Sequence, residues 1–251
     1  MSAFLTTSWD DGHPMDLRLA ELLARYQLKG TFYIPSPKSG LKVMSDNQIR
    51  SLHAMGMEIG AHTMTHVALP QLPSSRIRAE ALDGKQWLED ILGKSVGAFC
   101  FPRGKFNARA CQIVQESGYR FARTTVAFRT ELNFSPFQMP VSLQFVPHSR
   151  QIHLRHALKE GNWPGLRRWL TQCHADCDLD RLAIGMLEDI KRTSGVFHLW
   201  GHSWELEEMG LWSALESTLQ RITDRQGFRA IINSGLVAGR NVSLCSSAIS
   251  A

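Results

Sequence analysis

Acidic and imidazole side chains stand at three places in the 251-residue chain where an apolar run ends. Asp10 and Asp11 follow the run FLTTSW and precede a glycine. His62 and His66, in HTMTH, follow MEIGA, and His202 ends the run HLWGH. Adjacent ionised carboxylates repel each other, so a fixed pair needs a cation or a shared proton unless it belongs to a solvated turn.

These residue types suit metal-assisted hydrolysis of an amide or ester. Two histidines on one segment and a carboxylate from another strand make a three-ligand metal site with a position left for water. We therefore predict that Asp11, His62 and His66 bind one divalent ion. Asp10 then stays off the ion as a general base, and His202 protonates the leaving group.

The elements that must position these residues alternate between strand and helix patterns. Strands are expected at FLTTSW, GTFYIP, MEIGAH, GAFCFP, YRFART, MPVSLQFV and GVFHLWGH. Helices are expected after Pro14, after the Ser45–Gln48 capping box, over 75–92, after Asn107, and near 164–173, 179–192 and 212–225. Such alternation favours a parallel sheet, and the number of repeats indicates a closed or nearly closed barrel in one domain, residues 1–251. The carboxyl ends of barrel strands open on one face, where the acidic and histidine residues would converge. Residues 126–150 carry few helical signals and are expected to form a long irregular loop.

Composition narrows the classes of function. The formal net charge of +5 is spread along the chain and shows no nucleic-acid-binding pattern. No apolar run approaches the roughly 18 residues of a membrane span, and the first residues show no basic, apolar leader. We therefore expect no transmembrane segment, no signal peptide and a cytoplasmic location. Five cysteines, an odd number, fit reduced thiols, and the spacing of Cys173 and Cys177 does not suit a zinc clip.

Three motifs resemble those of the NodB-type polysaccharide deacetylases. TSWDDG is similar to the first family motif, T-F-D-D-G, HTMTH to the second, H-[S/T]-x-x-H, and HLWGHSWE to the histidine motif near the end of the domain. The resemblance covers residues 3–205. It implies a distorted (β/α) barrel of about seven strands that removes an N- or O-acyl group, most often acetyl, from a sugar.

The resemblance also implies the roles of individual residues. A divalent ion, zinc in many members and otherwise Co²⁺, Ni²⁺, Fe²⁺ or Mn²⁺, would be held by Asp11, His62 and His66. Asp10 would be the base and His202 the acid. The expected partners are an acylated sugar, a sugar nucleotide or a lipid-linked glycan. The sequence does not indicate the oligomeric state.

Two family motifs are altered. The third, R-P-P-Y-G, aligns with CFPRG, so Cys100 stands where the family has the arginine that braces the base. The fourth, an Asp-Trp pair, has no match between residues 119 and 140. Our hypothesis is that Arg103 or Arg123, at the ends of neighbouring strands, replaces the brace. The backbone N–H of Arg103 is a candidate oxyanion donor, because that role needs no particular side chain.

The residues around these motifs have both functional and structural interpretations. The candidates for substrate binding are Arg103, Trp200, Trp204 and His13, although a tryptophan at a barrel rim is as often ordinary packing and His13 as readily belongs to a turn. Core packing is expected for His198 and surface positions for the histidines 148, 153 and 156. Glu205, with its acidic neighbours 207 and 208, reads as a solvated charge run, with orientation of His202 as the alternative for Glu205.

Two other functions remain open at this point. The altered motifs suit a barrel that keeps the metal, has lost turnover and binds carbohydrate. Two histidines and a carboxylate also form the facial triad of iron oxygenases, which the strand–helix alternation argues against.

Overall fold

The computed structural model describes residues 3–238. Within them one parallel sheet is formed by β1 (Ala3–Asp10), β2 (Gly30–Ile34), β3 (Glu58–Ala61), β4 (Ala98–Cys100), β5 (Phe121–Arg123), β6 (Leu143–Gln144), β7 (Gly195–Gly201) and β8 (Phe228–Ala230). Seven strands follow the order β5-β4-β3-β2-β1-β7-β6, and β8 pairs with β1. On one edge of β1, β2 pairs with the second half of the strand and β8 with the first half. The expected barrel of about seven strands is confirmed, and β8 is an addition.

The curled sheet is open between β5 and β6, which form no ladder with each other in the described part of the chain. The segment 124–142 lies across this opening. Met139 N donates to Ala122 O on β5, and Ser142 N donates to His198 O on β7. The expected irregular loop is therefore present, and backbone hydrogen bonds hold it between the two ends of the sheet.

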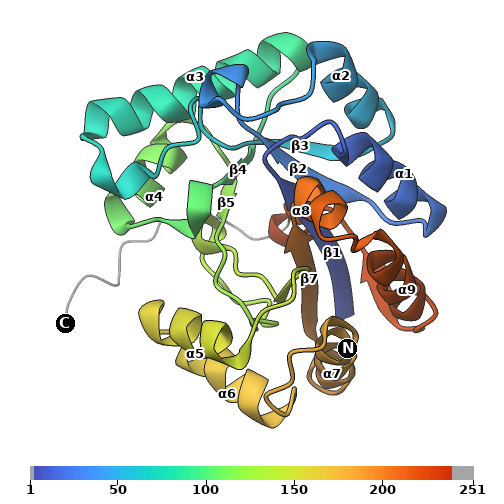
Figure 1. The fold of residues 1–251 in the computed structure, drawn as a ribbon. Helices are drawn as coiled ribbons and strands as arrows, with labels where there is room; N and C mark the ends of the chain where they lie inside the picture. The colour runs from blue at the N-terminus through green and yellow to red at the C-terminus, as the bar shows by residue number, and fades with distance from the viewer. Residues whose placement is uncertain (1–2, 239–251) are drawn as a thin grey trace.

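Helices surround the sheet (Figure 1). They are α1 (Asp16–Arg25), α2 (Asp46–Ala54), α3 (Ser74–Leu92), α4 (Ala108–Glu116), α5 (Arg150–Lys159), α6 (Trp163–Thr171), α7 (Leu179–Thr193), α8 (Ser203–Glu208), α9 (Trp212–Thr223) and α10 (Asn233–Val237), with short 3₁₀ turns at Pro37–Ser39, Leu69–Gln71, Pro102–Gly104 and Pro136–Gln138. None of the described helices is both long and apolar enough to span a membrane.

Local signals account for most of these boundaries. Ser45 and Gln48 form the expected capping box at α2, and the Asn107 side chain accepts from Ala110 N at the start of α4. The sequence did not indicate α5, α8, β8 and α10. α5 lacks a single apolar stripe, and the other three elements are short, so the periodic signal that marks longer elements is absent.

The core consists of apolar side chains from both faces of the sheet, as parallel strands covered by helices require. Every residue of β7 is buried. His198, on this strand, lies between Ser8 Oγ at 2.8 Å and the Pro140 carbonyl at 3.1 Å. Burial, together with the charge of Arg123, lowers the pKa of His198 to about 3, so it is a neutral core histidine as expected.

Candidate metal and catalytic site

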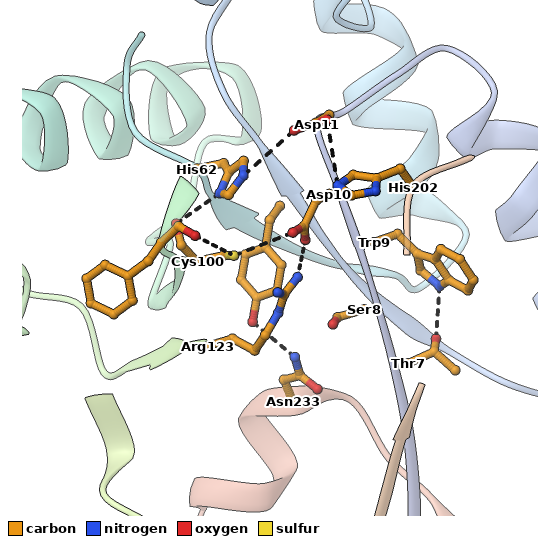
Figure 2. Close-up of polar contacts among 12 residues, drawn as sticks. Thr7, Ser8, Trp9, Asp10, Asp11, His62, Cys100, Arg123, His202 and Asn233 are labelled. Atoms are coloured by element: carbon orange, nitrogen blue, oxygen red, sulfur yellow. Dashed lines mark hydrogen bonds and ion pairs between the residues drawn. The ribbon is translucent and has the colours of Figure 1, made fainter. Parts of the chain in front are cut away.

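The two adjacent carboxylates face different partners. Asp10 is the last residue of β1, and the chain turns at once through left-handed backbone at Asp11 (φ 76°) and Gly12 (φ 62°). A Cβ at Gly12 would lie 2.5 Å from Ile34 Cγ2, so only glycine fits this turn. Figure 2 shows Asp11 facing His62 and His202, while Asp10 faces Arg123 and Cys100.

Asp11 and the two histidines of HTMTH converge. Asp11 Oδ1 lies 3.2 Å from His66 Nε2 and 3.7 Å from His62 Nε2. The His62 Nδ1–H donates to the Cys100 carbonyl at 2.9 Å, which leaves its Nε2 lone pair directed at Asp11. Burial lowers the pKa of His62 to about 4, so its ring is neutral, the form that binds a metal.

These residues fit a divalent cation. Their three ligand atoms lie within 4.8 Å of one another, and buried Asp11 Oδ1 has no hydrogen-bond partner in the described part of the protein. Burial opposes ionisation of Asp11, but the close contact with His66 and the charges of the neighbouring histidines outweigh burial and hold its pKa well below the usual range. A buried carboxylate oxygen that accepts no hydrogen bond, beside two ring nitrogens, provides the ligand atoms that zinc and similar ions bind.

A second group, Asp10, His62 and Cys100, has comparable spacing. Two of its ligand atoms are poorly suited to a metal. Arg123 donates a hydrogen bond to Asp10, and burial raises the pKa of the Cys100 thiol well above its usual value. A thiol must lose its proton to become a strong ligand. The geometry therefore favours the set built on Asp11.

The loop that carries His66 is fixed by Glu80 on α3. One carboxylate oxygen of Glu80 accepts from Met64 N at 3.0 Å and Thr65 N at 2.8 Å, and the other accepts from Thr65 Oγ1 at 2.8 Å. Sequence reasoning missed Glu80. Its signal was an acidic residue three positions after Ile77, on the buried stripe of the helix.

Arg123 is the partner of Asp10. Its guanidinium donates to Asp10 Oδ1, is fully buried, and lies over the rings of Tyr33 and Trp200 at 5.2 and 4.7 Å. Burial alone would lower the pKa of Arg123, but Asp10 outweighs burial and keeps it charged. Cys100 and Arg123 are paired positions on β4 and β5, so the arginine reaches the carboxylate from the neighbouring strand. Of the two arginines in our hypothesis, Arg123 makes this contact.

His202 follows β7 and lies opposite the ligand histidines. Its Nε2 is 3.8 Å from Asp11 Oδ2, and its Nδ1 is 2.6 Å from Glu205 Oε2. Burial disfavours the charged ring, but the Glu205 hydrogen bond and the charges of Asp10 and Asp11 raise its pKa above the usual value. The geometry thus matches the alternative in which Glu205 orients His202.

A cavity of about 820 Å³ opens from this cluster and is lined by Asp10, Asp11, both HTMTH histidines and His202. Of the four candidates for substrate binding, Arg103 and Trp200 also line it. His13 and Trp204 do not: His13 Nδ1 accepts from Met15 N at the start of α1, and Trp204 Nε1 donates to Asp11 Oδ2 at 3.0 Å.

We expected the histidines 148, 153 and 156 at the surface, and this prediction is wrong for His153. Its side chain is buried against the rings of Phe128 and Trp169, at centroid distances of 5.1 and 5.4 Å. The unpredicted helix α5 turns one face inward and brings this histidine under the cavity wall. His148 and His156 line the same wall.

Left-handed backbone recurs around the cavity. Asp11, Thr63, His66 and Arg103 have φ between 55° and 76°. For non-glycine residues this conformation costs on the order of 1–2 kcal/mol each, and it clusters where a site must hold side chains in set directions.

Comparison with known proteins agrees with the motifs. Residues 3–122 match the polysaccharide deacetylase family. A relative from Bacillus subtilis (strain 168), YxkH, named as a polysaccharide deacetylase, is 23% identical over 120 residues, which are 47% of this chain and 43% of the relative. The chain therefore spans less than half the length of this curated relative.

Solved structures share the fold. A Mycobacterium smegmatis protein named as a polysaccharide deacetylase aligns with a TM-score of 0.63 and 16% identity, over 94% of this chain and 88% of that one. BA3943 from Bacillus anthracis, described as a CE4 family pseudoenzyme, aligns with a TM-score of 0.58 and 14% identity, over 94% and 66%. The family match over residues 3–122 and the shared fold agree with the resemblance of the motifs to those of the NodB-type polysaccharide deacetylases.

Proposed function

We propose that this protein is a metal-dependent hydrolase that removes an acyl group, most often acetyl, from the nitrogen or oxygen of a sugar. The observation that carries the proposal is that two adjacent carboxylates contact different partners. Asp11 Oδ1 lies beside two histidine nitrogens, while Asp10 accepts from the Arg123 guanidinium. This is the arrangement that a metal ligand and a separate general base require.

Asp11, His62 and His66 would hold the divalent ion, zinc or one of its first-row neighbours. When bound, the ion supplies a Lewis acid that polarises the substrate carbonyl and lowers the pKa of its water. Asp10 accepts the proton of the attacking water, and the Arg123 guanidinium, which donates to Asp10 Oδ1, orients the carboxylate. Both residues come from strand ends, so their separation is set by the sheet.

His202 protonates the departing nitrogen or oxygen. Glu205 accepts from its Nδ1, so the other ring nitrogen, Nε2, is left to serve the substrate. The raised pKa keeps the ring protonated nearer to neutral pH, as a general acid needs. Arg103 and Trp200, on the cavity wall, remain our candidates for contacting the sugar.

A carbohydrate-binding barrel without turnover is the alternative, since a pseudoenzyme shares this fold. A pure binder has no need of a braced base or of an oriented acid. The Asp10–Arg123 and His202–Glu205 pairs therefore favour the hydrolase. The iron-oxygenase alternative is disfavoured by the parallel sheet, in which strands and helices alternate.

The test measures acetate and formate release from acylated amino sugars, sugar nucleotides and lipid-linked sugars after chelation and reconstitution with single metals. We expect turnover only in the reconstituted protein. Asp10→Asn should keep its metal and lose about 10²–10⁴-fold in kcat, the usual contribution of a positioned base. Asp83→Asn, at an exposed position on α3, is the matched control. Full metal content without release from any substrate would support the binding-only barrel. The expected cytoplasmic location is tested separately by cell fractionation.

A further inference from the structure

The helix pair α5–α6 carries an unusual share of exposed apolar side chains. Seven large hydrophobic residues are exposed in the described part of the chain, and four of them lie here: Leu154 (44% exposed), Leu158 (50%), Trp163 (64%) and Leu170 (51%). Single exposed leucines are normal on protein surfaces, but such a group within 17 residues of sequence (154–170) marks an interaction surface.

The exposed side chains follow the helical repeat. Leu154 and Leu158 are four residues apart on one face of α5, and Trp163 and Leu170 are seven apart on one face of α6. The inward sides of both helices are occupied by other residues, with Ala157 and Trp169 among the buried ones. In Figure 1 the two helices (yellow) lie side by side at the outer edge of the fold, away from α1–α4. The α5–α6 surface, as we call these four residues and the exposed basic residues beside them, faces outward.

The charged residues around these side chains are mostly basic. Residues 148–173 contain five lysines and arginines and a single acid, Glu160. Arg155, Lys159 and Arg167 are exposed and form no ion pair within residues 3–238. Leucine and tryptophan beside unpaired basic residues is the composition of helices that lie in a membrane–water interface.

We propose that the α5–α6 surface docks on a bilayer that contains anionic lipid. The basic residues would meet the lipid head groups, while the leucines and Trp163 reach the acyl boundary. A second copy of this chain is a poorer occupant, because a two-fold contact would set Arg155, Lys159 and Arg167 against their own copies.

The position of α5 links this surface to the cavity. His153, His156 and Lys159 line the cavity from α5, while Leu154 and Leu158 of the same helix face outward. Docking would therefore bring the cavity wall to the lipid head groups. If the proposed deacetylase function holds, the substrate class that fits is a lipid-linked acylated sugar.

The test is co-sedimentation with vesicles of phosphatidylcholine alone or mixed with phosphatidylglycerol. We expect the protein to pellet with the mixed vesicles only, and less so at high salt. Leu154→Gln/Leu158→Gln should lower the partition coefficient about tenfold or more, as should Arg155→Gln/Arg167→Gln. The matched control is Leu41→Gln/Leu82→Gln, two leucines of similar exposure elsewhere, which should bind as the parent does.

Absence of pelleting with mixed vesicles, or equal pelleting of all variants, overturns the proposal. So does a dimer in light scattering that Leu154→Gln/Leu158→Gln abolishes while vesicles bind neither protein, because a second copy would then cover the surface. Circular dichroism and Tm verify that each variant is folded. The readout needs no turnover, so Asp10→Asn should bind vesicles normally, and failure of the hydrolase proposal leaves this result intact.

Discussion

The two carboxylates of one dipeptide are supported in contrasting ways. Around Asp11, the proposed ligand set matches the family motif, and both histidines come from one short loop after β3. Around Asp10, the supporting residue is Arg123 on β5, while the position on β4 where the family has arginine is Cys100. The site around Asp11 has the residues of the family motif, whereas the site around Asp10 has an arginine charge that comes from a different strand.

The contrast shows how far a parallel sheet lets a side chain be replaced from a neighbouring strand. Paired positions on β4 and β5 lie side by side and point to the same face, so an arginine on either strand can reach one carboxylate. The metal ligands have less freedom, because three atoms must meet one ion at fixed distances. A motif scan therefore finds the ligand set and misses the brace.

The largest effect expected is loss of the metal. Asp11→Ala and His62→Ala each remove one of three ligands and should leave no stoichiometric metal after dialysis and no measurable turnover. Arg123→Lys should retain the metal, because Arg123 contacts Asp10, Tyr33 and Trp200 rather than the three proposed ligands. Elemental analysis of the three purified variants checks this, and full metal in either ligand variant would contradict the assignment.

Next in size is the brace. Arg123→Cys leaves Asp10 buried without its charge partner, which should cost roughly 3–5 kcal/mol of unfolding free energy and at least about 10²-fold in kcat. Cys100→Arg combined with Arg123→Cys restores a guanidinium from β4, as in the family, and should recover much of both losses. Denaturant unfolding and kcat measure the two effects. A double variant no better than Arg123→Cys would mean that the strand of origin matters.

A smaller effect is expected at Glu80, which holds the HTMTH loop without touching the metal. Glu80→Gln removes the charge that faces Met64 N and Thr65 N and leaves one acceptor oxygen where Glu80 has two. Because supporting residues of this kind tune ligand orientation, metal affinity should fall about 10–100-fold. Competition with a chelator measures it, with exposed Glu116→Gln on α4 as control. Unchanged metal affinity would show that the HTMTH loop keeps its conformation without the Glu80 carboxylate.

The smallest effect is a shift in pH dependence. The pKa of His202 is raised by Glu205 against the effect of burial, so the protonated acid persists to higher pH. Removal of the Glu205 charge in Glu205→Gln should lower this pKa and move the alkaline limb of kcat/KM to lower pH. Glu208→Gln, exposed on the same helix, should leave the profile in place. If Glu205→Gln also left it in place, His202 would not be the titrating acid.

The sequence predicted what depends on contiguous residues. The strands that end at Asp10 and Ala61 have strong β patterns and carry the ligand motifs, so the barrel face and the histidines could be placed together. The choice between Arg103 and Arg123 could not be made, because it depends on the β4–β5 register, which composition does not encode. The burial of His153 depends on α5, whose inward face becomes visible only once the helix packs.

The pairing of β1 has a consequence for how the chain acquires its structure during synthesis. β1 leaves the ribosome before the other strands of this sheet, yet it is bordered on one side by β7 and on the other by β2 and β8. Until β7 has been made, one full edge of β1 has no partner strand. Leu5 and Trp9, which are buried in the complete fold, then lack part of the surface that buries them. A nascent chain that already contains Asp11, His62 and His66 therefore still has one unpaired edge on β1, and residues 3–122, the stretch that matches the family, lack the strand that covers it.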